Sequence, residues 1–161
     1  MTTILLHAPL HRFSMDHGPA AVALSLAEQL RAPLTALLFD YPQAGRPEGD
    51  AAAARSALEG AAAARAVRLH CITEHSHAVG IHEVVAEEAR LRSLVVAGTD
   101  AEGLLPERQV TEYLLFESGR PVLVVPPGAT HVDLTTIAIA WDGGRCAARA
   151  LGDAAALIHQ A

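Results

Sequence analysis

Side chains that could bind an anion lie in two short polar segments of the chain. The first, PLHRFSMDHG at residues 9–18, contributes His11, Arg12, Asp16 and His17. The second, Gly98-Thr99-Asp100, follows a short apolar run. An arginine guanidinium can hold a phosphate or carboxylate in two hydrogen bonds, and a helix N-terminus nearby would add backbone N–H donors. The two segments form one candidate anion site if the fold brings them together; otherwise they are solvated loop charges.

Cysteine and histidine, which are zinc-binding residue types, gather in a third segment. Within twelve residues it contains Cys71, His75, His77 and His82. Their spacing matches no standard zinc motif, and one loop rarely turns four side chains inward. His82-Glu83 begins the metalloprotease frame H-E-x-x-H, but residue 86 is alanine, so that reading fails. We expect no metal site, and a metal-binding sensor is kept only as an alternative function.

The basic residues and the net charge exclude several classes of function. Every basic residue is arginine, so no phosphate-loop lysine, kinase lysine or Schiff-base lysine is present. The formal net charge is −6. This value argues against a nucleic-acid partner, because phosphate binding needs an excess of lysine and arginine. The sequence also has no G-x-S-x-G motif, and we expect no catalysis.

The alternation of apolar runs with helical patterns predicts how these segments are placed. Short apolar runs predict strands over residues 3–8, 34–39, 67–73, 93–97 and 121–125. Helical patterns lie between them, over residues 18–31, 50–66, 78–92 and 107–118. This order predicts an α/β fold, a doubly wound five-stranded parallel sheet with helices on both faces. Ligands of such folds bind beyond the carboxyl ends of the strands, so both polar segments should overhang one cleft.

Local signals place the ends of two of these helices. Asp16 is expected to cap the helix over residues 18–31, with Pro19 in its first turn, where proline is tolerated. Gly119 is expected to end the helix over residues 107–118.

The C-terminal residues repeat the pattern that opens the chain. TTIAIAWDGG at residues 135–144 shares its start and its alternation with TTILLHAPL at residues 2–10. We expect three elements here: a strand over 136–141, a turn at Asp142-Gly143-Gly144 and a helix over 145–159. The chain is thereby divided into a complete domain at 1–127, a linker at 128–134 and an extra C-terminal βα unit at 135–161, the first unit of an incomplete second domain.

Four stretches of the chain resemble the universal stress protein family. They are TTILLHAPL, SLVVAG with the helix after it, FESGRPVLVVP and IAIAWDGGRCAARAL. Residues 2–127 resemble one complete domain of the family, and residues 135–161 resemble the opening of another, as in tandem-domain members. The resemblance implies the strand order 3-2-1-4-5 and dimerisation through the last strand.

The resemblance also implies where a nucleotide would bind. Family members that bind ATP have an aspartate after strand one, and a G-x-x-G motif followed about nine residues later by G-[ST] after strand four. Gly98 matches the first glycine. Pro9 and Ala101 stand at the aspartate and the second glycine, and Thr111-Glu112 replaces the G-[ST] pair. The complete domain therefore departs from the ATP-binding pattern.

Two further residues match the pattern in part. Gly103 could restore some of the loop, and Asp142 matches the aspartate in the tail, although the loop that completes its site would lie beyond Ala161. The candidate nucleotide- or anion-binding residues are His11, Arg12, Gly98, Thr99, Asp100, Gly103 and Asp142. We expect a non-catalytic binding or regulatory module of a stress response, with a degenerate nucleotide site and no required cofactor. The alternatives are an ATP- or AMP-binding protein or weak ATPase that uses an atypical cleft, and the metal-binding sensor.

The expected partner is a second copy of the chain. PVLVV at residues 121–125 has no charge to protect a sheet edge. We expect a homodimer, formed through this strand edge or by exchange of the tail at 135–161. The N-terminus lacks the features of a signal peptide, and no apolar stretch is long enough to span a bilayer. The sequence therefore predicts a cytoplasmic protein with no membrane partner.

Overall fold

The computed structural model of the protein describes residues 2–40, 50–75, 80–100 and 107–160. The strands of its sheet are β1 (Ile4–Pro9), β2 (Leu34–Asp40), β3 (Leu69–His75), β4 (Leu94–Gly98) and β5 (Val122–Val125). The helices are the 3-10 helix η1 (Leu10–Arg12), α1 (Pro19–Gln29), α2 (Ala51–Ala64), α3 (Ile81–Arg90), α4 (Glu107–Glu117), α5 (Arg145–Asp153) and α6 (Ala155–Ile158). None of these described helices is both long enough and apolar enough to cross a bilayer.

The strands form one parallel sheet in the order β3-β2-β1-β4-β5. This confirms the predicted α/β fold, as well as the strand order that the resemblance implied. The central strand is β1, in which Ile4 pairs with Leu34 on one side and Leu94 on the other. The carboxyl ends of β1 and β4 are therefore neighbours, which is where the two polar segments were expected to meet.

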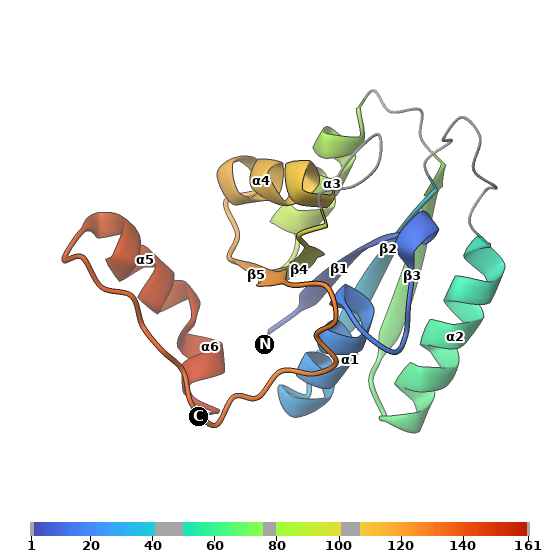
Figure 1. Cartoon of the computed structure of the whole chain (residues 1–161), viewed down its shortest axis with the longest axis horizontal. Coiled ribbons are helices and arrows are strands. Elements are labelled where there is room, and N and C mark those ends of the chain that lie inside the picture. The colour runs from blue at the N-terminus through green and yellow to red at the C-terminus, as the bar shows by residue number, and fades with distance from the viewer. Residues whose placement is uncertain (1, 41–49, 76–79, 101–106, 161) are drawn as a thin grey trace.

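Both faces of the sheet are covered, as Figure 1 shows. Leu6 and Ala8 of β1 pack with residues of α1 and α2, whereas Leu5 packs with residues of α3 and α4. Because alternate residues of β1 meet a helical layer on either side, every residue of the strand is buried. Side chains of the central strands can reach solvent only at the strand ends, which places the functional groups there.

Side-chain caps and glycines define the helix ends, and one predicted cap is wrong. Asp50 caps α2, its Oδ1 accepting a hydrogen bond from the backbone N–H of Ala53 at 2.8 Å. Pro19 is the first residue of α1, as predicted, but Asp16 does not cap that helix. The N-cap is Gly18, at a φ of 78° that favours glycine. Gly119 ends α4 with a φ of 65°, as predicted.

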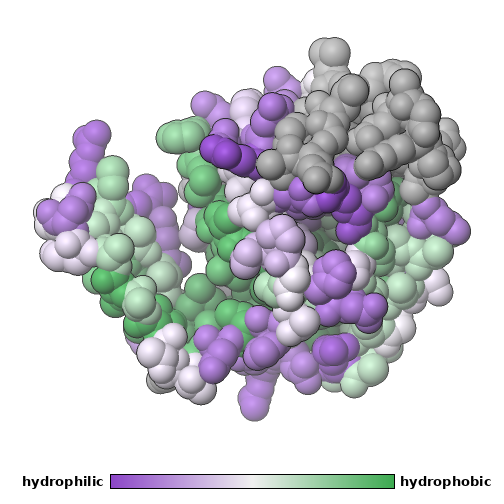
Figure 2. All heavy atoms as spheres, in the orientation of Figure 1, coloured by the Kyte–Doolittle hydropathy of each residue, from purple (hydrophilic) through white to green (hydrophobic). Residues whose placement is uncertain are grey.

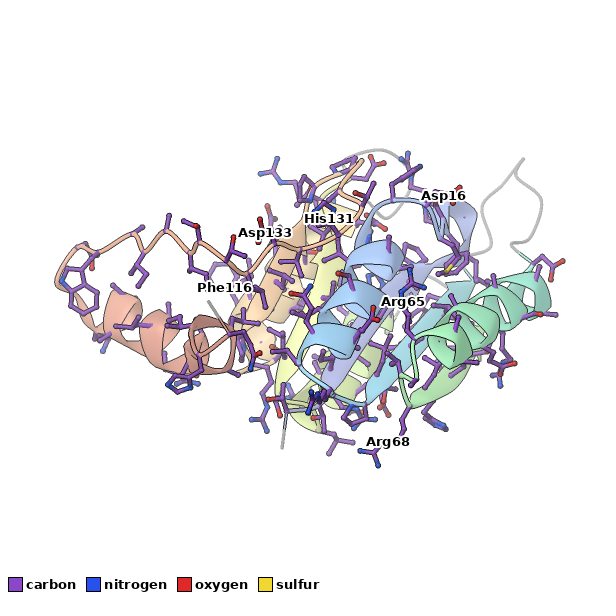
Figure 3. The ribbon with its side chains drawn as sticks, turned by 90° about the horizontal axis from the view of Figure 1, so that it is seen from below. Asp16, Arg65, Arg68, Phe116, His131 and Asp133 are labelled. Carbon is purple, nitrogen blue, oxygen red and sulfur yellow. The ribbon has the colours of Figure 1, made fainter. Side chains whose placement is uncertain are left out.

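The segment after β5 is not a free linker. The carbonyl oxygen of Ala129 accepts a hydrogen bond from the N–H of Gly18 at 2.6 Å, and that of Val132 accepts one from Gln29 Nε2 at 2.9 Å. Leu134 is buried in the core on the α1 face. In Figure 3 the labelled His131 and Asp133 mark this segment as it passes α1. Residues 128–134 are thus fastened to the domain.

The tail differs from the sequence expectation in two ways. Residues 136–141 form no strand, because none of the described strands lies beside them to complete a ladder. The expected helix over 145–159 breaks at Ala154 into α5 and α6, next to Gly152, a poor helix former. Trp141 is 57% exposed. The division into a first domain and the start of a second remains a prediction.

His7 is a polar side chain inside the central strand. It is fully buried, and its ring centroid lies 5.9 Å from that of Phe39. Burial, with smaller contributions from the charges of His11 and His82, lowers the pKa of His7 from 6.5 to about 4. The native protein therefore holds this imidazole neutral at pH values where an unfolded chain would protonate it.

We predict that this histidine makes the fold sensitive to acid. Between pH 6.5 and about 4 the unfolded chain binds a proton at His7 and the native chain does not, so the free energy of unfolding should fall by about 3 kcal/mol as the pH decreases. In the variant His7→Gln the side chain at residue 7 cannot bind a proton. The free energy of unfolding, measured from urea unfolding curves, should therefore lose this part of its pH dependence. The exposed control His131→Gln should keep it. Equal acid sensitivity in the wild type and His7→Gln would contradict the assignment.

Candidate functional site

A cavity of about 260 Å³ opens at the carboxyl end of the sheet. It lies between the end of β1, η1 and the loop after it, the N-terminus of α1, the start of α4 and the end of β5. Phe13, Val125 and Pro127 contribute apolar surface, and Arg12 and Asp100 contribute charge. Its volume is just below the range of about 300–1,000 Å³ that is common for small-molecule sites. We call this cavity the cleft.

The two predicted polar segments do meet in the cleft. Arg12 of η1 forms an ion pair with Asp100, which follows β4. The side chains are 23% and 22% exposed, so the pair lies at the cleft mouth and is partly shielded from water. Arg12 was expected to hold an anion, but in this structure it faces a carboxylate of the protein itself.

Glu107 places a second carboxylate in the cleft. It is the first residue of α4, lines the cavity and is only 7% exposed. Burial raises the pKa of Glu107 above its ordinary value, and the nearby charge of Arg12 opposes that rise. No described residue donates a hydrogen bond to it. The helix N-terminus, which favours an anion, is thus already occupied by one belonging to the chain.

Gly98 forms the floor beneath this carboxylate. A Cβ built on Gly98 would overlap Oε2 of Glu107 and come within 2.8 Å of its carboxyl carbon. The carbonyl oxygen of Gly98 accepts a 2.7 Å hydrogen bond from Oγ1 of Thr111, which is buried in α4. The glycine that matches the nucleotide-binding pattern therefore has a structural reason in this chain: it lets α4 bring its own carboxylate against β4.

The remaining predicted residues lie around the cleft or away from it. His11 belongs to η1, and its charge helps to lower the pKa of His7. Thr99 lies after β4, and its Oγ1 donates a hydrogen bond to the carbonyl oxygen of Val125 at 3.5 Å. Asp142 is in the tail, where its Oδ1 accepts from the N–H of Gly144 at 2.7 Å, and it does not line the cleft. Gly103 lies outside the described residues.

The zinc-type residues are only partly described. His77 and the side chain of His75 fall outside the described residues. The ring of His82 packs against Tyr113, with centroids 5.1 Å apart. Within the described ranges no three histidine, cysteine or acidic side chains come together as metal ligands.

Sequence reasoning missed Glu107. It was the first residue of the helix predicted over 107–118, and that helix follows the strand ending at Gly98. The sequence did contain a signal, because an acidic residue stood at the first position of a helix whose N-terminus was expected to face an anion. The sequence could not show how deeply the side chain is buried, because that depends on the packing of α4 against β4.

The contact between Gly98 and Glu107 gives a direct prediction. The variant Gly98→Ala should lower the free energy of unfolding by about 1–3 kcal/mol, because the new Cβ would collide with the carboxyl group. Removing that group as well, in Gly98→Ala/Glu107→Ala, should recover most of the loss. In the control Gly60→Ala the Cβ meets nothing within 4 Å, and the helix α2 should be unchanged or slightly more stable. Additive losses in the double variant, measured by chemical unfolding, would contradict the contact.

Comparison with solved structures identifies known proteins that have a similar fold. No protein-family model matches the sequence, and no curated protein does either. A solved structure of a protein from the universal stress protein family of Burkholderia pseudomallei is similar, with a TM-score of 0.51 and 20% identity over 76% of this chain and 95% of that one. A universal stress protein in complex with cAMP is similar with a TM-score of 0.50 and 16% identity, over the same shares of the two chains. At these identities the likeness establishes the architecture, and the chain has the universal stress protein fold.

Proposed function

We propose that the chain is a non-catalytic binding module of a stress response, whose cleft accepts a small ligand and repels phosphate groups. The observation that carries this proposal is the buried carboxylate of Glu107 at the N-terminus of α4. In this account the nucleotide site of the fold is degenerate because the chain supplies its own anion. A cytoplasmic setting suits the free thiols of Cys71 and Cys146.

The charges of the cleft support the exclusion of phosphate. Arg12 is matched by Asp100, and Glu107 adds one further negative charge. A phosphate oxygen about 5 Å from one unit charge would meet roughly 3 kcal/mol of repulsion at an effective dielectric constant of 20. It would also meet the carboxylate of Glu107 at the start of α4, where the helix N-terminus would otherwise favour an anion. Several losses of this size remove micromolar affinity.

The residues that line the cleft also indicate which class of ligand it could bind. A buried carboxylate that receives no hydrogen bond from the described residues invites a donor from a ligand or from water. Phe13, Val125 and Pro127 would contact an apolar body. The ligand class that fits is therefore a small molecule that has an N–H or ammonium donor and no phosphate.

Nucleotide binding is the second candidate, and one observation favours it. A structure with this fold was solved with cAMP. Hydrolysis of a nucleotide is harder to support, because the transferred phosphate must be held by cations or backbone amides, the sequence has no lysine, and the cleft arginine is paired. A metal-binding sensor has no supporting observation among the described residues.

Titration calorimetry with AMP tests the exclusion of phosphate. The wild type should show no binding tighter than about millimolar. The variant Glu107→Ala should bind AMP at least about tenfold more tightly, because it removes one charge and exposes the start of α4. The control Glu112→Ala removes an exposed carboxylate of the same helix, one paired with Arg108, and should behave as the wild type does. Micromolar binding of AMP to the wild type, or equal affinities in the two variants, would overturn the proposal.

The ligand class can be tested with a matched pair of small probes. Benzylamine and benzoate have the same ring and opposite charges. Benzylamine should raise the melting temperature of the wild type at millimolar concentration, and it should do so less in Glu107→Gln. Benzoate should raise neither. A larger effect of benzoate than of benzylamine on the wild type would contradict the role given to the carboxylate.

A further inference from the structure

Large apolar side chains are exposed mainly at one side of the molecule. Among the described residues these are Leu91, Leu115, Phe116, Val124, Ile139, Trp141 and Leu151. All except Leu91 belong to α4, to β5 or to the tail after residue 134. Phe116 is 83% exposed, and Figure 3 shows it on the side of the domain where the tail lies. Apolar surface concentrated in this way marks an interaction site.

The sheet ends on this side with an unpaired edge. β5 pairs with β4 along one side only, and Val124 is 40% exposed. An edge strand presents a row of backbone N–H and C=O groups to any strand that can approach. The edge residues Val122–Val125 include no charge, proline or bulge that would discourage such pairing.

A groove of about 770 Å³ lies next to this edge. One wall is formed by Leu115 of α4 with Val122 and Leu123 of β5, and the other by Ala150 of α5 and Leu157 after it in α6. Figure 2 shows the hollow between the tail and the domain, with hydrophobic residues along its base. A groove with apolar walls beside a strand edge is shaped for an added strand.

The chain contains a segment with the properties of that strand. Residues 136–141, TIAIAW, are uncharged and alternate large with small side chains, yet they pair with none of the strands that the structure describes. They do not line the groove of their own chain, whose outer wall is formed by α5 and α6. The preceding residues are fastened to α1 through Ala129, Val132 and the buried Leu134. The segment is therefore held outside its own groove.

We infer that residues 136–141 of a second copy of the chain add to the free edge of β5, in a reciprocal two-fold exchange. Their alternation would turn Ile137, Ile139 and Trp141 to one face, toward the apolar groove. The charges of the groove agree with this fit. Arg149 and Asp153 in its lining pair with each other, which leaves Arg120 and Arg145 to attract Asp142, the residue directly after the inserted segment. The inference does not depend on the function proposed for the cleft.

Light scattering on the full chain tests the exchange. The wild type at micromolar concentration should have twice the monomer mass of 16.9 kDa. Ile139→Asp, in the donated segment, and Val124→Asp, on the accepting edge, should each halve that mass. Leu91→Asp is the matched control, since Leu91 is 68% exposed but does not line the groove, and it should leave the mass unchanged.

Trp141 gives a second, independent readout, because it is the only tryptophan of the chain. Its emission should be blue-shifted in the wild type and in Leu91→Asp, and should move to the red in Ile139→Asp and Val124→Asp. A monomeric wild type would overturn the inference, and a blue-shifted monomer would show that the segment folds into its own groove. A dimer that survives Ile139→Asp and is lost in Val124→Asp would show direct pairing of two β5 edges and would also overturn it.

Discussion

The carboxylate of Glu107 lies where a parallel α/β sheet offers its best anion site, and much of the cleft depends on that contact. The start of α4 faces the end of β4, and helix N-termini in this position attract negative charge. Here the attracted charge is part of the chain, pressed against Gly98. The contact requires glycine at residue 98 and places a second carboxylate near Arg12, beside that of Asp100. In the function that we propose, it also sets the sign of charge that a ligand must carry.

The rest of the fold explains why this contact can form. Because β1 is buried on both faces, polar chemistry is confined to the carboxyl edge of the sheet, where η1 and the start of α4 converge. The bond from Gly18 to Ala129 lets the chain after β5 close one side of the same edge. The lateral β5 edge of the sheet has a different character, because no described strand pairs with it on its outer side and apolar side chains are exposed nearby. The surfaces that we propose for ligand binding and for assembly are therefore separate.

Much of the fold could be predicted from the sequence, and the failures share a physical cause. Leucine- and valine-rich runs predicted all five strands, since a strand buried on both faces needs such residues along its whole length. The meeting of Arg12 with Asp100 followed from topology alone, because strands one and four are neighbours in a doubly wound sheet. The prediction of a strand over 136–141 was wrong, since a strand exists only when another strand lies beside it and local alternation of side chains cannot supply that partner. The burial of Glu107 escaped prediction for a related reason, because it depends on contact between elements.

The most direct measurement of the central claim is the pKa of Glu107, followed by carbon-13 NMR of its side-chain carboxyl and assigned by the loss of the signal in Glu107→Gln. We expect the pKa of Glu107 to lie above the ordinary 4.5, because the carboxyl group is buried and receives no hydrogen bond from the described residues. A value at or below 4.5 would mean that the group is in water or fully paired with a cation. In that case it would not occupy the cleft as its internal anion, and the account would be wrong.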